Sequence, residues 1–325
     1  MKRVIAAVLI VAGAALLAGA AYSSQRPPGA PYEMRYSAMP AEALSEIAGY
    51  GLDSAPLERI EITAPDARRP IATGIVTRAA EGRLAPLSWR NDVTEPILFA
   101  DLAASDAAKV VAAIREHVPS EAVVLAWWDF SRLIRSVAGR QAPLDDPLAR
   151  GLLTPAVWRS SGDHGSEQER SLWGAGVPNN DGEVFAKFID ALLLDEARGA
   201  AALAEIAGDK PAYLAMRLSD IWKAAAVHPD RVSIAYKDFP GASGAHGVMK
   251  AASQWMQERK IEGGYAVEPI GAAIRLHYLP RKSDSELLIA RLLPFSTSNP
   301  MRLERFDLVY QHKDFWIYKF KPTKS

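Results

Sequence analysis

The chain has 325 residues, with 38 basic and 38 acidic side chains, six histidines and no cysteine. The lack of cysteine excludes disulfides, cysteine-ligated zinc or iron–sulfur centres and covalently attached c-type haem. A formal net charge of zero gives no broad basic face for nucleic-acid phosphates. We therefore expect no binding to nucleic acid. Because 49% of the residues are hydrophobic, we expect a globular protein with a sizeable core.

The N-terminus has the pattern of an export segment. Lys2 and Arg3 precede an uncharged apolar run, Val4–Ala21. At about 1.5 Å per residue such a helix spans roughly 27 Å, and the two basic residues favour a cytoplasmic N-terminus. The small residues 18–20 also fit a signal-peptidase site, so a membrane anchor and a cleaved signal both remain open. In either case residues 1–22 predict a main domain in the periplasm, tethered to the bacterial inner membrane or released from it.

The composition changes after this segment. Residues 23–40 are polar and punctuated by proline, which predicts an extended tether. Residues 41–100 predict a small β-rich entry segment, in which Leu57–Ile62 alternates like a strand. The remaining residues, 101–325, predict an α/β domain.

The first part of this domain predicts a helix, a strand and a second helix. Apolar residues recur at helical spacing over 101–117. The run 122–128 is short and continuously apolar, which is typical of a buried parallel strand. Residues 130–137 then predict a helix that ends at Gly139. This order predicts an open α/β sheet, a fold in which ligands bind at the carboxyl ends of the strands.

The second part repeats the alternation and closes with strands. Helices are predicted over 184–198, from Ser219 onward and over 248–260, strands over 210–216, 232–236, 273–279, 306–310 and 315–320, and a glycine-rich loop over 240–247. The last two strands predict a C-terminal β-hairpin. We therefore expect an α/β fold in which a single N-terminal transmembrane or signal helix precedes an exported open-sheet domain with a C-terminal hairpin.

One candidate binding site follows the first predicted strand of the domain. Neighbouring residues on a strand face opposite sides, so we expect one of Trp127 and Trp128 in the core and the other in the crevice. Asp129 and Ser131 would then form a polar edge for a ligand or partner, with Arg132 as counter-charge. The structural alternative is that Asp129 caps the following helix.

A second candidate site lies in the loop after the strand predicted over 232–236, which includes the glycine-rich residues 240–247. Asp238 and His246 have the chemistry of a base and an acid, or of two metal ligands. Because two ligands do not complete a metal site, we predict no metal, and because the sequence holds no cofactor motif, we predict no cofactor. Loops that follow parallel strands gather on one side of a sheet, so we expect this loop to approach Asp129. The alternative is a surface loop in which the histidine caps the next helix.

The segment Val118–Ser131, with Ile134 and Gly139-Arg140 after it, resembles the Trp-Trp-Asp-Tyr-Gly region in the exported domain of oligosaccharyltransferase catalytic subunits. In that family the Trp-Trp-Asp group binds the acceptor peptide. Phe130 and Ser131 replace the Tyr and Gly, and one apolar segment replaces the family's many membrane helices. The resemblance implies a shared exported α/β fold and argues against glycosyl transfer.

Over its whole length the chain resembles the HaoB family, which is encoded beside the octahaem hydroxylamine oxidoreductase of ammonia- and methane-oxidising bacteria. The resemblance rests on Ala126–Arg132, Lys210–Tyr213, Ile234–Pro240 and Gly244–Gly247. It implies an accessory role in periplasmic hydroxylamine oxidation, with a multihaem hydroxylamine oxidoreductase as the partner. It supplies no catalytic residues.

Three kinds of function remain open. The sequence holds no nucleophile elbow, no Walker phosphate loop and no paired-histidine zinc helix. Together with the export segment and the resemblance to the HaoB family, this favours a non-catalytic accessory protein, tethered at the membrane, that binds a periplasmic redox enzyme. One alternative is a periplasmic enzyme or metal-binding protein that uses Asp129, Ser131, Asp238 and His246 in a single crevice. The other is a peptide- or glycan-binding module.

Overall fold

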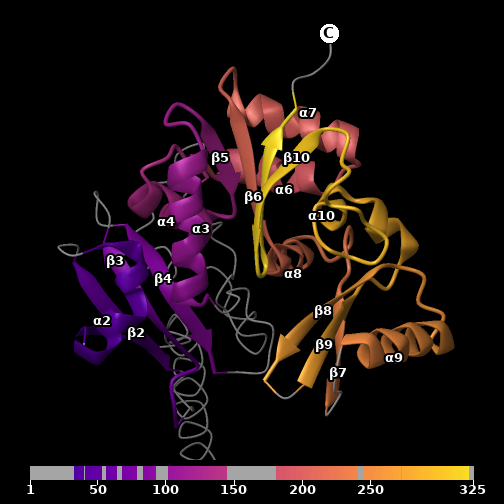
Figure 1. The fold of residues 1–325 in the computed structure, drawn as a ribbon, viewed down its shortest axis with the longest axis horizontal. Coiled ribbons are helices and arrows are strands. Elements are labelled where there is room, and N and C mark those ends of the chain that lie inside the picture. The colour runs from indigo at the N-terminus through magenta and orange to yellow at the C-terminus, as the bar shows by residue number, and fades with distance from the viewer. Residues whose placement is uncertain are drawn as a thin grey trace, which may run out of the picture.

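The computed structural model describes residues 33–39, 41–52, 56–63, 68–78, 83–92, 102–144, 181–240, 245–271 and 273–321. Within these ranges, no helix combines the length and the apolar character needed to span a membrane. The predicted anchor or signal, residues 1–22, lies outside them. The predicted α/β class is confirmed as a mixed α/β protein with several sheets (Figure 1).

The N-terminal part forms a four-stranded antiparallel sheet. Its strands, in the order β1-β2-β3-β4, are β1 (Glu33–Ala38), β2 (Leu57–Thr63), β3 (Ala72–Arg78) and β4 (Leu84–Asn91). The helix α2 (Ala41–Ile47) and a 3₁₀ turn (Ala48–Tyr50) follow β1. The alternating stretch at 57–62 is a strand, as predicted. Residues 33–38, in the stretch predicted as a tether, pair with β2, and Met34 packs against the core.

A mixed sheet forms the centre of the molecule. Its order is β10-β11-β6-β5, with β5 (Val123–Ala126), β6 (Ala212–Arg217), β10 (Phe306–His312) and β11 (Phe315–Phe320). β5 and β6 are parallel, and the other pairs are antiparallel. Every residue of β5 and β6 is buried, which explains their continuous apolar sequences. The C-terminal hairpin is confirmed, and β5 lies at one edge of the sheet.

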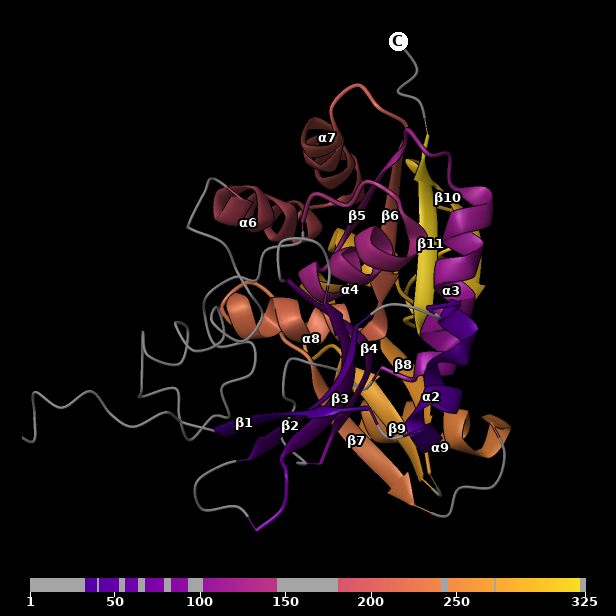
Figure 2. The same cartoon turned by 90° about the vertical axis from the view of Figure 1, so that its left-hand side faces the viewer.

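Helices cover both faces of the mixed sheet. They are α3 (Ala104–His117), α4 (Trp128–Leu133) with the π-helix Ile134–Ala138, α6 (Asp181–Leu192), α7 (Glu196–Ala207), α8 (Leu218–Val227) and α10 (Leu288–Arg291). Figure 2 shows α3 on one side of the sheet and α6, α7 and α8 on the other. The single helix predicted over 184–198 is wrong. Asp195 accepts a hydrogen bond from the backbone of Arg198 and starts a second helix there.

A three-stranded antiparallel sheet lies below the mixed sheet in Figure 1. Its order is β7-β9-β8, with β7 (Ala235–Pro240), β8 (Tyr265–Ile270) and β9 (Ala273–Tyr278), and α9 (Ala245–Glu258) packs on one face. Ala252, Met256 and Leu276 form a small core there, distinct from the main one. The strand predicted at 232–236 begins later and includes Asp238, which was expected in a loop. Strand β8 was not predicted.

Candidate functional site

The two parallel strands end beside a cluster of buried charges. Asp129 lies in the first turn of α4, just after β5, and Lys223 lies on α8, just after β6. The Lys223 ammonium is 3.1 Å from the Asp129 carboxylate and 3.1 Å from that of Asp220. These three side chains are between 2% and 6% exposed. The carboxyl ends of parallel strands thus hold charged groups, as the sequence predicted for Asp129.

Local sequence explains how α8 presents its charges. Asp220 and Lys223 are three residues apart, a spacing that brings side chains together on a helix. The second carboxylate oxygen of Asp220 accepts a hydrogen bond of 2.7 Å from the backbone N–H of Arg217, which caps the start of α8. One carboxylate therefore starts the helix and also holds the lysine.

The cluster continues into the C-terminal hairpin. The Arg217 guanidinium lies 2.8 Å from the carboxylate of Asp314, in the turn between β10 and β11. It also stacks over the ring of Phe315, 4.6 Å from the centroid. The ion pair fixes the hairpin turn against the end of β6.

The pKa values of two of the buried groups, Asp220 and Arg217, are shifted. Burial raises the pKa of Asp220, although the Lys223 ammonium opposes this. Burial acts to lower the pKa of Arg217, but the nearby carboxylates, first Asp314 and then Asp129, outweigh it and raise the pKa. The cations of the cluster therefore oppose the cost of burying its carboxylates, and removal of one cation would leave a buried carboxylate without its contact.

The tryptophan pair differs from the prediction. Trp127 and Trp128 are both 1% exposed, so the prediction that one of them lines a crevice is wrong. The strand ends at Ala126 and the helix begins at Trp128, so the alternation of a strand does not reach them. Trp127 packs edge-on against Phe185, at 5.2 Å between ring centroids, and lies beneath the Lys223 ammonium. Both rings are part of the core.

Ser131 and Arg132 are also buried, against the prediction of an exposed polar edge. The Ser131 hydroxyl donates to the carbonyl of Ala126, 3.0 Å away. Arg132 lies over the Trp128 ring and donates to the carbonyl of Leu84, at 2.9 Å. It therefore ties α4 to the N-terminal sheet.

The residues of the two predicted clusters lie on different elements. Asp238 lies on β7 and makes a two-pronged ion pair with Arg275 of β9, at 2.8 and 2.9 Å. The Arg275 hydrogen bonds lower the pKa of Asp238. His246 lies in α9, and its side chain is outside the described part of the chain. Among the described side chains, no hydrogen bond or ion pair joins Asp238 to Asp129, and no three potential ligands are grouped to hold a metal.

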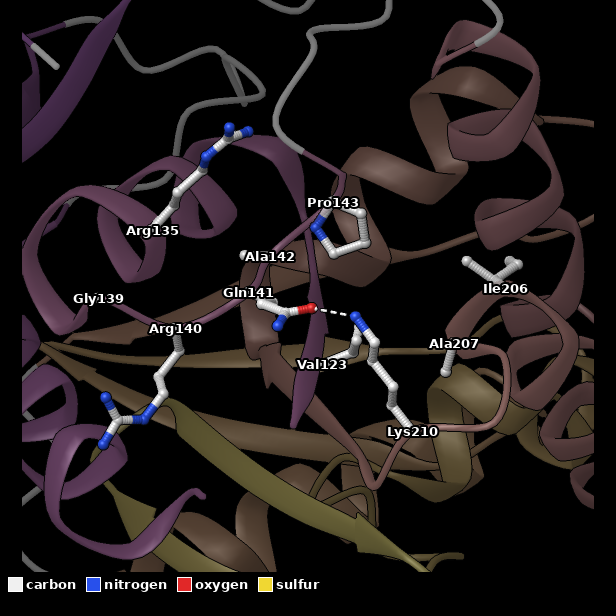
Figure 3. Close-up of a pocket in the computed structure, with 10 residues that line it drawn as sticks. All are labelled: Val123, Arg135, Gly139, Arg140, Gln141, Ala142, Pro143, Ile206, Ala207 and Lys210. Atoms are coloured by element: carbon white, nitrogen blue, oxygen red, sulfur yellow. Dashed lines mark hydrogen bonds between the residues drawn. The ribbon is translucent and has the colours of Figure 1, made fainter. Parts of the chain in front are cut away.

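A pocket of about 570 Å³ opens at the other end of the parallel pair, at the amino end of β5 (Figure 3). Three basic residues line it, Arg135, Arg140 and Lys210. Lys210 donates to the side-chain oxygen of Gln141, at 2.6 Å. In Figure 3 the guanidinium of Arg140 points away from Lys210, and it donates to carbonyls at the end of α3, including that of Val118 at 2.8 Å. Arg140 thus stabilises a helix C-terminus.

The sequence prediction missed Asp220, Lys223, Arg217 and Asp314. The signal for the first two was available, because an Asp-x-x-Lys spacing follows directly after a predicted buried strand. No local pattern points to Asp314, which meets Arg217 across 97 residues.

The described residues thus define a mixed α/β protein with a buried ion cluster at the carboxyl ends of its two parallel strands. The chain belongs to the HaoB family, described as HaoA-associated protein HaoB, which matches residues 1–320. Membership of this family associates the chain with HaoA and with hydroxylamine oxidation.

Two solved structures are similar to part of the chain. The C-terminal domain of C. jejuni PglB is 12% identical, with 66% of this chain and 99% of that one covered and a TM-score of 0.37. The C-terminal globular domain of an oligosaccharyltransferase from Archaeoglobus fulgidus is 13% identical, with 66% and 95% covered and a TM-score of 0.31. No curated protein sequence matches the chain significantly.

Proposed function

We propose that this chain is a membrane-tethered periplasmic accessory protein that binds or assists HaoA, a multihaem hydroxylamine oxidoreductase. The observation that carries the proposal is the family match over residues 1–320, which includes the N-terminal segment. The apolar run 4–21 after two basic residues supports export and attachment to the inner membrane.

The candidate site supports a framework role within this function. Its charged groups lie in the interior and bind one another, from α4 through α8 to the hairpin turn. Buried, mutually paired ions hold loops in one arrangement and present few groups to a substrate. In the proposed accessory protein these ion pairs hold α4, α8 and the hairpin turn together.

Deletion of the gene in its native host tests the accessory role. We expect hydroxylamine oxidation per cell to fall, and to be restored by the full chain and by Lys109→Met, a change at an exposed position of α3. Lys223→Met should restore it less well, because it breaks the buried cluster. An unchanged rate in the deletion strain, with unchanged HaoA content, would contradict the proposal.

Location is tested separately. In spheroplasts, protease added from outside should digest the chain, while a cytoplasmic marker protein stays intact. Alkaline washing should leave the chain with the membranes if residues 4–21 anchor it. Protection from external protease would contradict the periplasmic location.

A further inference from the structure

Three side chains join α8 to the three-stranded sheet. The indole nitrogen of Trp222, next to Lys223 on α8, lies 3.0 Å from Nδ1 of His277 on β9. The other ring nitrogen, Nε2, lies 2.9 Å from a carboxylate oxygen of Glu268 on β8. The His277 side chain is 7% exposed, so its ring nitrogens depend on these partners.

These contacts determine the tautomer of His277. An indole N–H can only donate, so Nδ1 must accept and carries no hydrogen. The hydrogen of the neutral ring therefore lies on Nε2 and is donated to Glu268. This bond lowers the pKa of Glu268.

The two hydrogen bonds serve different parts of the fold. The bond to Glu268 lies within the sheet, between β8 and β9. The bond from Trp222 joins the sheet to α8, the helix that carries Asp220 and Lys223. The sheet has its own small core under α9. Figure 1 shows α8 beside the upper end of this sheet.

We propose that His277 is a pH-dependent contact between α8 and the three-stranded sheet. When the ring takes up a proton at Nδ1, it can no longer accept from Trp222, and two N–H groups then face each other. The hydrogen bond from Nε2 to Glu268 remains, and it now joins a positively charged ring to a carboxylate. Acidification thus breaks the contact with α8 and keeps the contact within the sheet. The groups involved all belong to this chain, so the test does not depend on HaoA.

The charged and titratable groups around this contact are Glu268 on β8, Tyr236 and Asp238 on β7, Arg275 on β9, and Arg217 before α8. Glu268 accepts a hydrogen bond from the ring, and Asp238 is paired with Arg275. Trp222 favours the neutral ring, because only that form accepts its hydrogen.

The test is nuclear magnetic resonance of the full chain with ¹⁵N-labelled histidine and tryptophan. At high pH we expect the nitrogen shifts of His277 to show an unprotonated Nδ1 and a protonated Nε2. On acidification, the indole proton of Trp222 should move upfield along the same curve as the His277 ring. The opposite tautomer, or a Trp222 signal that stays constant while His277 titrates, would overturn the proposal.

Variants test the two partners in opposite directions. Trp222→Phe should move the His277 midpoint to higher pH, since the neutral form loses its donor. Glu268→Gln should move it to lower pH, since the protonated form loses its carboxylate. His277→Asn should remove the pH dependence of the Trp222 signal, whereas His117→Asn, at a side chain 58% exposed on α3, should leave it unchanged. Midpoints that do not move, or that move the other way, would contradict the assignment.

Discussion

Lys223 and Asp129 are 94 residues apart in the chain, and their charged groups meet in the interior at 3.1 Å. The contact joins the helix after β5 to the helix after β6. Because Lys223 also contacts Asp220, one ammonium is shared by two buried carboxylates. The buried guanidinium of Arg217 is a second positive charge near both of them.

Lys223→Met should be strongly destabilising. The change keeps the volume of the side chain but leaves Asp129 and Asp220 buried without the ammonium that contacts both, which typically costs about 3–5 kcal/mol. Urea unfolding at neutral pH measures this as a lower midpoint with an unchanged slope. Lys109→Met, at an exposed position, should change the free energy of unfolding by less than about 0.5 kcal/mol.

A triple variant separates charge from packing. If Asp129→Asn and Asp220→Asn are added to Lys223→Met, the buried negative charges disappear and most of the lost stability should return. A triple variant as unstable as Lys223→Met alone would show that packing, and not charge, is the cause.

Trp127→Ala and Trp128→Ala should each cost about 3–5 kcal/mol in free energy of unfolding. Both rings are 1% exposed, and each removal would leave a large cavity in the core. Val309→Ala, at a side chain 42% exposed, serves as the control and should cost less than about 0.5 kcal/mol. A small loss at only one tryptophan would support the crevice position that the structure contradicts.

Substitution by alanine should change the stability of the fold in opposite directions at two glycines. Gly74 on β3 pairs with Trp89 on β4, and an added Cβ would lie 2.6 Å from the Trp89 ring and 2.8 Å from the Ser88 carbonyl. Gly247 lies in α9, and an added Cβ there would meet nothing within 4 Å.

Thermal unfolding should therefore show a lower Tm for Gly74→Ala, because the sheet must shift to admit the methyl group. Gly247→Ala should raise the stability by about 0.5–1 kcal/mol, through helix propensity and a less flexible unfolded chain. Equal effects of the two changes would contradict the packing described for Gly74.

The ion pair between Asp238 and Arg275 should give a pH-dependent stability. The pKa of Asp238 lies below its ordinary value of 3.8, so the folded protein holds this proton less tightly than the unfolded chain. The stabilisation that the ion pair gives is therefore fully present above the ordinary pKa of 3.8, and it is lost as the pH falls through the lowered pKa of Asp238.

Asp238→Asn should accordingly cost less than about 1 kcal/mol at neutral pH, because the carboxylate is 42% exposed and partly screened by solvent. The difference from the parent protein should shrink as the pH is lowered through the acidic range. Urea unfolding at a series of pH values measures it, and a difference that grows with acidity would contradict the assigned shift.

Short apolar runs predicted much of the central sheet. The runs that became β5 and β6 are buried on all sides, and the hairpin strands alternate, so local sequence was sufficient for these elements. The pairing of β6 with β11 joins residues about 100 positions apart, and local periodicity carries no information on it.

The candidate site was predicted only in part. Asp129 lies at the end of a parallel strand, as the order of elements predicted. The prediction for the two tryptophans was wrong because the strand ends at Ala126, and the alternation of side chains between the two faces ends with it. Asp238 was expected in a loop near Asp129, but its strand pairs within a separate sheet, where Arg275 is its partner.

Direct binding to HaoA tests the central claim. Sedimentation velocity of purified, fluorescently labelled HaoA can be measured with increasing amounts of the purified full chain in detergent. We predict that the HaoA boundary sediments faster and that the shift saturates at a fixed ratio of the two proteins. A HaoA boundary that stays unchanged at the highest soluble concentration of this chain would contradict its role as a HaoA partner.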